Sequence, residues 1–150
     1  MANNETILKG TYCILIRLNS DAVIAVGRLG ELNFKKGYYV YVGSALNSLM
    51  PRIKRHLSRD KKLHWHIDYF LGHKGVEVID VLYAVDDIKW ECKLASLISK
   101  NASGIENFGS SDCKCDSHLF YFKNFGDMEN RCISAFKKLD LKLERFDHSD

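Results

Sequence analysis

Glu91 is a carboxylate at a position where a purely structural helix rarely carries one. It precedes Leu94 by three residues and Ile98 by seven, so it lies on or beside the apolar face of a predicted helix. An unpaired charge at such a position is costly to remove from water. Coordination of a metal ion would explain the carboxylate, which makes Glu91 the first candidate for a metal ligand.

Two glycine-tyrosine elements and a basic helix accompany this carboxylate. Gly10-Thr11-Tyr12 opens one predicted strand, and Tyr41-Val42-Gly43 closes another. Arg52 and His56 follow on a predicted helix, four residues apart, and therefore share one of its faces. Tyrosines on neighbouring strands often only pack. Together with Arg52, His56 and Glu91, however, Tyr12 and Tyr41 become candidate active-site residues.

The stretch from Pro51 to Lys62 (PRIKRHLSRDKK) carries six Lys or Arg residues against one Asp, on a chain whose net charge is only +3. Such a stretch is either a solvated helix face or the footprint of a phosphate backbone. The second interpretation predicts that the chain binds nucleic acid. The residues expected to contact it are Arg55, Arg59, Lys61, Lys62 and His64.

The segment HWHIDY follows the basic stretch. His64 and Asp68 are four residues apart and share a predicted helix face, whereas His66 lies on another. They could form a second ligand cluster, or a His–Asp pair that assists proton transfer or grips phosphate. The alternative is a set of helix-surface residues around an anchoring Trp65. The place of His64 directly after the basic stretch favours a functional role for it.

A glycine- and serine-rich loop contains the motif C-x-C-x₂-H, formed by Cys113, Cys115 and His118. Zinc accepts all three of these ligands, and Cys92 or a histidine of HWHIDY could supply a fourth. The spacing is not the usual C-x₂-C knuckle, and the thiols could instead pack as small hydrophobic groups. Structural Zn²⁺ is therefore a candidate cofactor beside a catalytic cation.

Length and composition favour one globular domain spanning residues 1–150. Hydrophobic residues make up 46% and charged residues 27% of the chain, an ordinary balance for a folded protein. We expect a cytoplasmic protein without a membrane partner, because no apolar run is long enough to span a bilayer and the N-terminus lacks a signal-peptide hydrophobic region. Five cysteines favour free thiols or metal ligands over disulfides, with Cys13 and Cys132 in the core.

The elements that position these residues are read from apolar patterns and turn signals. Strands are predicted at 11–18, 22–26, 37–42, 76–85 and 119–122. Helices are predicted to begin near Ser48, to cover 64–71, to run from Asp86 or Asp87 to Ser99 with Ile88 facing inward, and to begin near Met128. This order predicts an α/β (α+β) fold in which helices sandwich a small mixed sheet.

These motifs together resemble the GIY-YIG nuclease superfamily, and in particular a small branch that occurs as a stand-alone domain, of the domain of unknown function 123 type. The resemblance runs from Gly10 to about Tyr121. It rests on GTY and YVG for the two tyrosine strands and on YVGSA, RIKRHL, HWHIDY and FGSSDCKCDSHL. Each motif alone is weak, but together they are specific.

The resemblance implies a GIY-YIG-like fold and a metal-dependent endonuclease that cuts nucleic acid, with DNA favoured over RNA. It implies that Glu91 holds Mg²⁺ or Mn²⁺ and that Arg52 neutralises charge on the phosphate in the transition state. Tyr12, with Tyr41 or His56 nearby, would orient or deprotonate the attacking water. Tyr12 can act as a base near neutral pH only if the metal and Arg52 lower its pKa.

One departure from the superfamily concerns Tyr12 and Tyr41, which are 29 residues apart instead of being joined by a short hairpin. We expect an insertion, the strand at 22–26 with its turns, that leaves the two tyrosine strands adjacent. Two other classes of function stay open. One is a non-catalytic nucleic-acid-binding module on the same scaffold, and the other is a zinc-stabilised interaction domain.

Overall fold

The three strands richest in apolar residues lie side by side at the centre of a sheet. In this computed structural model, which describes residues 8–100, 102–110 and 115–147, β1 (Gly10–Leu18) pairs antiparallel with β4 (Gly37–Ala45) on one side. On its other side β1 pairs antiparallel with β5 (Val76–Val85). Each of these strands was predicted from its run of β-branched and aromatic residues, and each is confirmed.

Shorter strands complete the sheet on both sides. β7 (Leu119–Phe122) pairs with β4, and the two-residue strands β6 (Ser103–Gly104) and β8 (Glu144–Arg145) form the edges. The order across the sheet is β6-β7-β4-β1-β5-β8. All strand pairs among the described residues are antiparallel, so the prediction of a mixed sheet is wrong in this respect.

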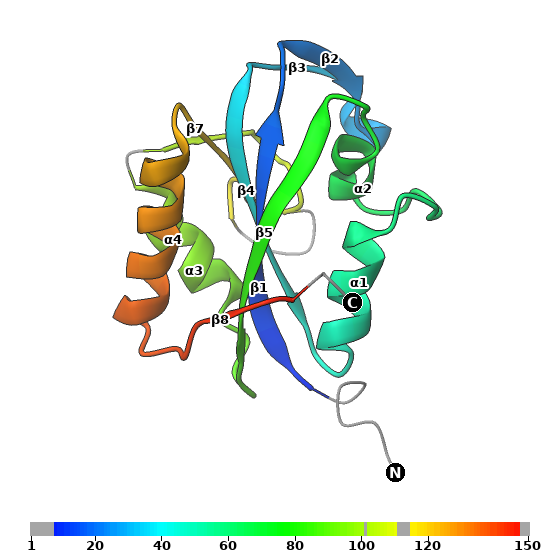
Figure 1. Ribbon diagram of the computed structural model, residues 1–150. Coiled ribbons are helices and arrows are strands. Elements are labelled where there is room, and N and C mark those ends of the chain that lie inside the picture. The colour runs from blue at the N-terminus through cyan, green and yellow to red at the C-terminus, as the bar shows by residue number, and fades with distance from the viewer. Residues whose placement is uncertain (1–7, 101, 111–114, 148–150) are drawn as a thin grey trace.

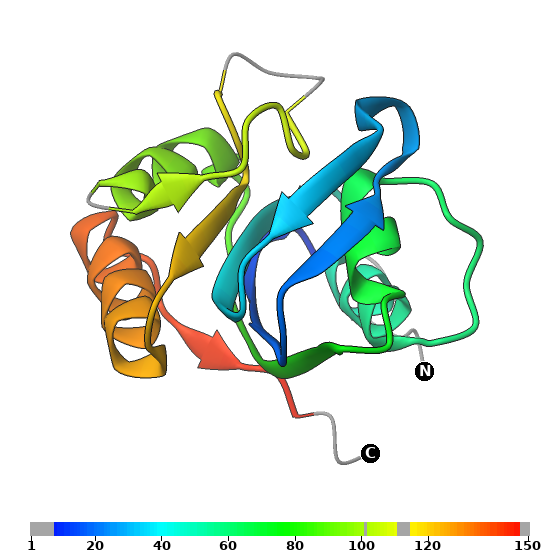
Figure 2. The same cartoon turned by 90° about the horizontal axis from the view of Figure 1, so that it is seen from above.

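Two pairs of helices cover the two faces of the sheet (Figures 1 and 2). On one face lie α1 (Leu49–Leu57) and α2 (His66–Leu71), and on the other lie α3 (Glu91–Ser99) and α4 (Phe125–Lys138). This arrangement confirms the predicted α+β fold with helices on both sides of the sheet. Among the described residues, no helix has the length and apolar character that crossing a membrane requires.

Alternation along β1 creates two separate cores. Tyr12, Ile14 and Ile16 belong to the core beneath α1 and α2, whereas Cys13 and Leu15 belong to the core beneath α3 and α4. Successive side chains of a strand point to opposite faces, so a single strand supplies both cores. Cys132 of α4 shares the second core with Cys13, and both are fully buried, as predicted.

The insertion expected between the tyrosine strands is present as a hairpin. β2 (Ala22–Ala25) and β3 (Glu31–Phe34) pair with each other in a separate two-stranded sheet, joined through a 3₁₀ turn at Gly27–Leu29. The hairpin lies near α2 in Figure 1, and Ile24, Val26 and Phe34 join the core beneath α1 and α2. β1 and β4 are therefore adjacent despite the sequence between them. The strand β3 was not predicted.

Helix starts were predicted less accurately than strands. α3 begins at Glu91, not at Asp86 or Asp87, because the Asp86 carboxylate accepts a hydrogen bond from the backbone N–H of Ile88 and forms a local turn. Ile88 is 58% exposed, so its predicted inward position is wrong. α4 begins at Phe125, before the predicted start, because the Asn124 side chain caps it by accepting from the Asp127 N–H.

The start of α1 is confirmed at Ser48, but the Ser48 side chain makes no capping hydrogen bond. Pro51 lies within the first turn, where a helix has no intrahelical use for the backbone N–H that proline lacks. The helix that was predicted at 64–71 begins two residues later, at His66. His64 and Trp65 therefore precede α2 in a turn that connects it to α1.

Candidate active site

Tyr12 on β1 lies directly opposite Gly43 on β4. A Cβ atom added to Gly43 would come within 2.5 Å of both Cζ and the hydroxyl oxygen of Tyr12. Gly43 is thus required by the close approach of the Tyr12 ring, since any side chain there would displace it. Tyr41, two residues earlier on β4, has its side chain on the same face, in the core beneath α1 and α2.

The Tyr12 hydroxyl forms a buried hydrogen bond with Nε2 of His56 on α1, at 2.7 Å. Both side chains are only 2% exposed. Burial, followed by the neighbouring Tyr41, raises the pKa of Tyr12 well above its usual value. Burial, followed by Lys61, lowers the pKa of His56 to about 3. Both groups are therefore neutral at neutral pH.

These shifts correct part of the predicted chemistry. Arg52 does lower the pKa of Tyr12, but burial and Tyr41 outweigh it, so the net shift is opposite to the one that a tyrosinate base needs. Nδ1 of His56 is buried and has no hydrogen-bond partner among the described residues. A protonated ring would bury a positive charge that has no further hydrogen-bond partner, which is a physical reason for the ring to stay neutral.

Glu91 is held at the first turn of α3 by two side chains from other elements. Ser44 of β4 donates to Oε1 at 2.5 Å, and Nδ1 of His118 lies 2.8 Å from Oε2. Burial alone would raise the pKa of Glu91, but the contacts with His118 and Ser44 outweigh it and the net shift is downward. Glu91 is therefore ionised, with its side chain 15% exposed. The predicted position beside the apolar stripe of Leu94 and Ile98 is confirmed, since both are fully buried.

Arg52 reaches the same place from α1. Its Nη1 donates to the backbone carbonyl of Ser44 at 2.7 Å, and its guanidinium carbon lies 5.0 Å from the centre of the Trp65 ring. Ser44 therefore connects the two charged groups, since its hydroxyl contacts Glu91 and its carbonyl contacts Arg52. The cation–π contact with Trp65 helps to hold the guanidinium in this position.

These residues open onto one cleft of about 430 Å³. Its walls come from β1, β4, α1, the turn before α2, the start of α3 and the chain just before β7. The lining includes Tyr12, Tyr41, Arg52, His64, Trp65, Lys89, Glu91 and His118. A larger hollow of about 690 Å³ beside α3 has no Lys, Arg or His in its described lining, so it is less suited to an anion.

Comparison with known protein families identifies the family of this chain. The profile described as "Domain of unknown function DUF123" matches residues 11–141, which include every residue of the cleft. The chain belongs to this family. No curated protein and no solved structure gives a match. The family description assigns no activity, so nuclease function and the link to GIY-YIG enzymes stay predictions.

In this DUF123 domain, Asp68 of the HWHIDY segment has a structural role. Its side chain is fully buried and accepts from both Nη1 and Nη2 of Arg55 at 3.0 Å. It also accepts from the backbone N–H groups of His64 and Trp65. Burial alone would raise the pKa of Asp68, but these hydrogen bonds lower it overall. The predicted His64–Asp68 pair thus forms through the backbone N–H of His64. The Asp68 carboxylate is occupied by these contacts within the fold and not by a ligand.

The two other residues of this segment take different places. Trp65 is stacked by Arg52 on α1 and by Arg55, whose guanidinium carbon lies 4.4 Å from the ring centre. His66 accepts a hydrogen bond at Nδ1 from the Gly109 N–H. The side chain of His64 is exposed and lines the cleft. The predicted anchoring role of Trp65 is confirmed, and His64 lies where a ligand could meet it.

The predicted phosphate-binding residues divide into two groups. Arg55 is committed to Asp68 and to the carbonyl of Lys62, and Lys61 donates from Nζ to the carbonyl of His56 at 2.7 Å. Both therefore hold the fold together around α1. Of the predicted residues, Arg59 and Lys62 are exposed, so they could reach an external phosphate backbone.

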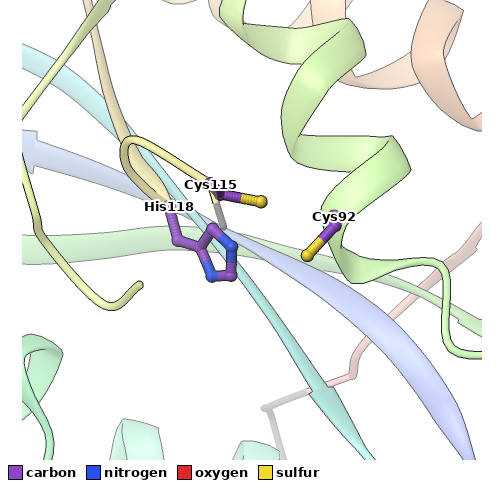
Figure 3. A group of neighbouring side chains, drawn as sticks. All are labelled: Cys92, Cys115 and His118. Carbon is purple, nitrogen blue, oxygen red and sulfur yellow. The ribbon is translucent and has the colours of Figure 1, made fainter. Parts of the chain in front are cut away.

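The cysteine-histidine motif is only partly described. Cys113 lies outside the described residues. Cys115 and His118 come together with Cys92, one residue after Glu91, and their ligand atoms all lie within 4.8 Å of one another (Figure 3). Of the two predicted sources for a further ligand, the structure brings Cys92 to the group.

Sequence analysis did not select Ser44 or Lys89, and it did not foresee the steric role of Gly43. Ser44 contacts both Glu91 and Arg52, yet a serine after a glycine carries no signal of its own. Lys89 lines the cleft and lowers the pKa of Glu91, and its place before α3 could not be recognised while the helix start was misassigned. Gly43 was noticed as part of YVG, but its steric role depends on the strand register.

Proposed function

We propose that this DUF123 domain is a metal-dependent endonuclease that hydrolyses phosphodiester bonds of nucleic acid, with DNA favoured over RNA. The observation that carries the proposal is the convergence on one cleft of an ionised carboxylate, an arginine and a tyrosine that is hydrogen-bonded to the buried His56. Glu91, Arg52 and Tyr12 come from three separate elements, α3, α1 and β1. Packing alone gives no reason for these groups to meet at a surface cleft.

Glu91 is suited to a hard divalent cation such as Mg²⁺ or Mn²⁺. It is ionised, partly exposed in the cleft, and next to the hydroxyl oxygen of Ser44. Mg²⁺ is commonly held by one or two carboxylates, with waters and substrate phosphate in the other positions. When bound, such an ion stabilises negative charge on the phosphate and on the leaving oxygen.

Arg52 supports the proposal through its charge and through the contacts that hold it at the cleft. A guanidinium has five N–H donors, and the described contact with Ser44 uses Nη1. The stack on Trp65 presents the group at the wall of the cleft. Arg52 would bind a phosphate oxygen of the substrate and neutralise the charge that grows on it in the transition state.

Tyr12 acts in this proposal as a hydrogen-bonding group and keeps its proton. With the His56 ring proton on Nδ1, the Tyr12 hydroxyl would donate to Nε2 of His56, and its oxygen lone pairs could accept a hydrogen bond from the attacking water. Hydrolysis forms the bond between the water oxygen and phosphorus and breaks the bond to the 3′ oxygen. The 3′ oxygen takes the proton that the water loses.

Glu91→Gln tests the proposal most directly. The amide keeps the shape of the side chain but removes the charge that attracts a divalent cation, so cleavage should fall on the order of a thousandfold while binding changes little. Fluorescent single-stranded, duplex and branched DNA and the matching RNAs are incubated with Mg²⁺, Mn²⁺ or EDTA, and products are resolved on gels. Binding is measured by anisotropy with EDTA present.

Glu31→Gln is the matched control, because Glu31 is an exposed carboxylate on β3, outside the cleft. It should cleave and bind as the wild type does. Cleavage by Glu91→Gln at the wild-type rate in limiting Mg²⁺ would place the metal elsewhere. Salt-sensitive binding without cleavage by the wild type would favour the non-catalytic binding module instead, and absence of both would refute a nucleic-acid function.

A further inference from the structure

A second group of side chains, distinct from the proposed catalytic residues, lies at the edge of the cleft. Cys92 is the second residue of α3, Cys115 belongs to the glycine- and serine-rich loop, and His118 directly precedes β7. Their ligand atoms all lie within 4.8 Å of one another. In Figure 3 the two sulfur atoms and one nitrogen of the His118 ring are turned toward a common point.

We propose that Cys92, Cys115 and His118 bind a Zn²⁺ ion that clamps the start of α3 to the chain before β7. Two thiolates and one imidazole form a donor set that prefers zinc over the hard cations suited to Glu91. This proposal concerns a separate ion and does not depend on the nuclease proposal.

The separations are compatible with a tetrahedral ion after a small movement of side chains. Zn–S and Zn–N bonds of roughly 2.3 and 2.0 Å at tetrahedral angles place ligand atoms about 3.5–3.8 Å apart. The ligand atoms of this group are therefore at most about one ångström further apart than those of a zinc-bound site. Rotations about the side-chain bonds of two cysteines can close such a gap, so the backbone need not move. The three ligands leave a fourth position for water or another donor.

The orientation of His118 provides an independent observation. Its Nδ1 lies 2.8 Å from Oε2 of Glu91, and the ring is only 1% exposed. A zinc-bound histidine almost always directs its other ring N–H to a carboxylate or carbonyl, which fixes the tautomer and the ring plane. Because Nδ1 faces Glu91, Nε2 is the nitrogen that would bind the metal.

The same contact couples the two sites. Zn²⁺ on Nε2 of His118 holds the proton on Nδ1, and this N–H then donates to Glu91 permanently. The zinc ion would thereby fix the carboxylate that faces the cleft, in addition to tying α3 to the chain before β7. Loss of zinc is expected to loosen both the local fold and the position of Glu91.

Metal content and cobalt substitution test the site. Protein purified without added zinc is analysed by elemental mass spectrometry, and the wild type should hold about one equivalent of zinc. Cys92→Ser should hold less than about a tenth of an equivalent. Cys132→Ala, which removes a cysteine buried in the other core, should retain the full equivalent. Circular dichroism spectra establish that each variant is folded.

A second measurement uses only the wild type, so it does not depend on the folding of a variant. Zinc is removed with a chelator, the melting temperature is expected to fall by several degrees, and added Zn²⁺ should restore it. Added Co²⁺ should give an intense sulfur-to-cobalt absorption band. Zinc below a tenth of an equivalent in the wild type together with no cobalt band would overturn the proposal. So would full zinc content in Cys92→Ser, or an intact mass showing a Cys92–Cys115 disulfide.

Discussion

The two faces of the central sheet are built from the same strands but hold together by different means. The face beneath α1 and α2 buries tyrosines, His56 and Asp68, and these polar groups are fixed by specific partners. The core beneath α3 and α4 consists of aliphatic and aromatic side chains with Cys13 and Cys132. Along β1 the division falls between neighbouring residues, since Tyr12 faces one side and Cys13 the other.

This difference separates a polar face, where the proposed active site lies, from an apolar face. A buried hydroxyl, imidazole or carboxylate needs a hydrogen-bond partner. Removing that partner leaves an unpaired buried polar group, which destabilises the folded state. The arrangement around Tyr12, His56 and Asp68 is therefore sensitive to single substitutions in a way that an apolar core is not. Glu91 and His118 extend the polar region around the edge of the sheet to the start of α3.

The largest effect on stability is expected for Asp68→Asn. The carboxylate accepts four hydrogen bonds, from Arg55 and from the backbone of His64 and Trp65, and an amide cannot accept all four. The NH₂ group of the asparagine would instead face one of these donors. Breaking a buried pair costs about 3–5 kcal/mol, and the lower end applies because the Arg55 side chain is 29% exposed. Urea unfolding followed by circular dichroism measures the loss.

Asp60→Asn is the control, because Asp60 is exposed on the same side of the molecule. It should change the free energy of unfolding by no more than about 0.5 kcal/mol. An equal loss in both variants would mean that surface charge, and not the buried Asp68–Arg55 pair, stabilises this region.

A smaller effect is expected from the pH dependence of His56. Its folded-state pKa of about 3 lies below the unfolded value, so the unfolded chain binds a proton first as the pH falls. The contribution of neutral His56 to the free energy of unfolding is fully present above about pH 6.5. It is lost as the pH falls from there toward 3. Between pH 6.5 and 5, before carboxylates titrate strongly, this amounts to roughly 2 kcal/mol for the one proton.

His56→Gln should flatten this part of the stability curve, because glutamine can still hydrogen-bond to Tyr12 but does not titrate. Unfolding in urea at several pH values gives the slope for each protein. His64→Gln removes an exposed histidine and should leave the wild-type slope in place. An unchanged slope in His56→Gln would show that the imidazole is not held neutral by its burial.

Much of the sheet could be predicted, because β1, β4 and β5 are long apolar runs whose composition differs clearly from their surroundings. β6 and β8 could not, since each has two residues and depends on a neighbour for its hydrogen bonds. β3 buries only Phe34 and carries little periodic signal. The start of α3 was misplaced because an aspartate that caps a helix and one that forms a turn are the same residue type.

The candidate site shows the same limit. Arg52, His56 and Glu91 could be selected from residue type and helical spacing, and the adjacency of the tyrosine strands followed from treating 22–26 as an insertion. The partner of each side chain could not be selected. Whether Tyr12 meets Gly43 or Tyr41 depends on strand register, and the contact of His118 with Glu91 joins elements that are far apart in the sequence. Burial, which reverses the expected pKa shift of Tyr12, is also set by tertiary packing.

The smallest effect is expected for Cys132→Ala in the apolar core. The substitution removes one buried sulfur atom that neighbours Cys13, and neither residue contacts the cleft. Loss of one buried heavy atom costs about 1 kcal/mol, because the transfer term and the small cavity add. Ser134→Ala, two residues further along α4 at an exposed position, should change the free energy of unfolding by no more than about 0.5 kcal/mol. Urea unfolding of both variants compares them with Asp68→Asn. If Cys132→Ala costs as much as Asp68→Asn, the buried polar contacts of one face give it no greater sensitivity than plain packing gives the other.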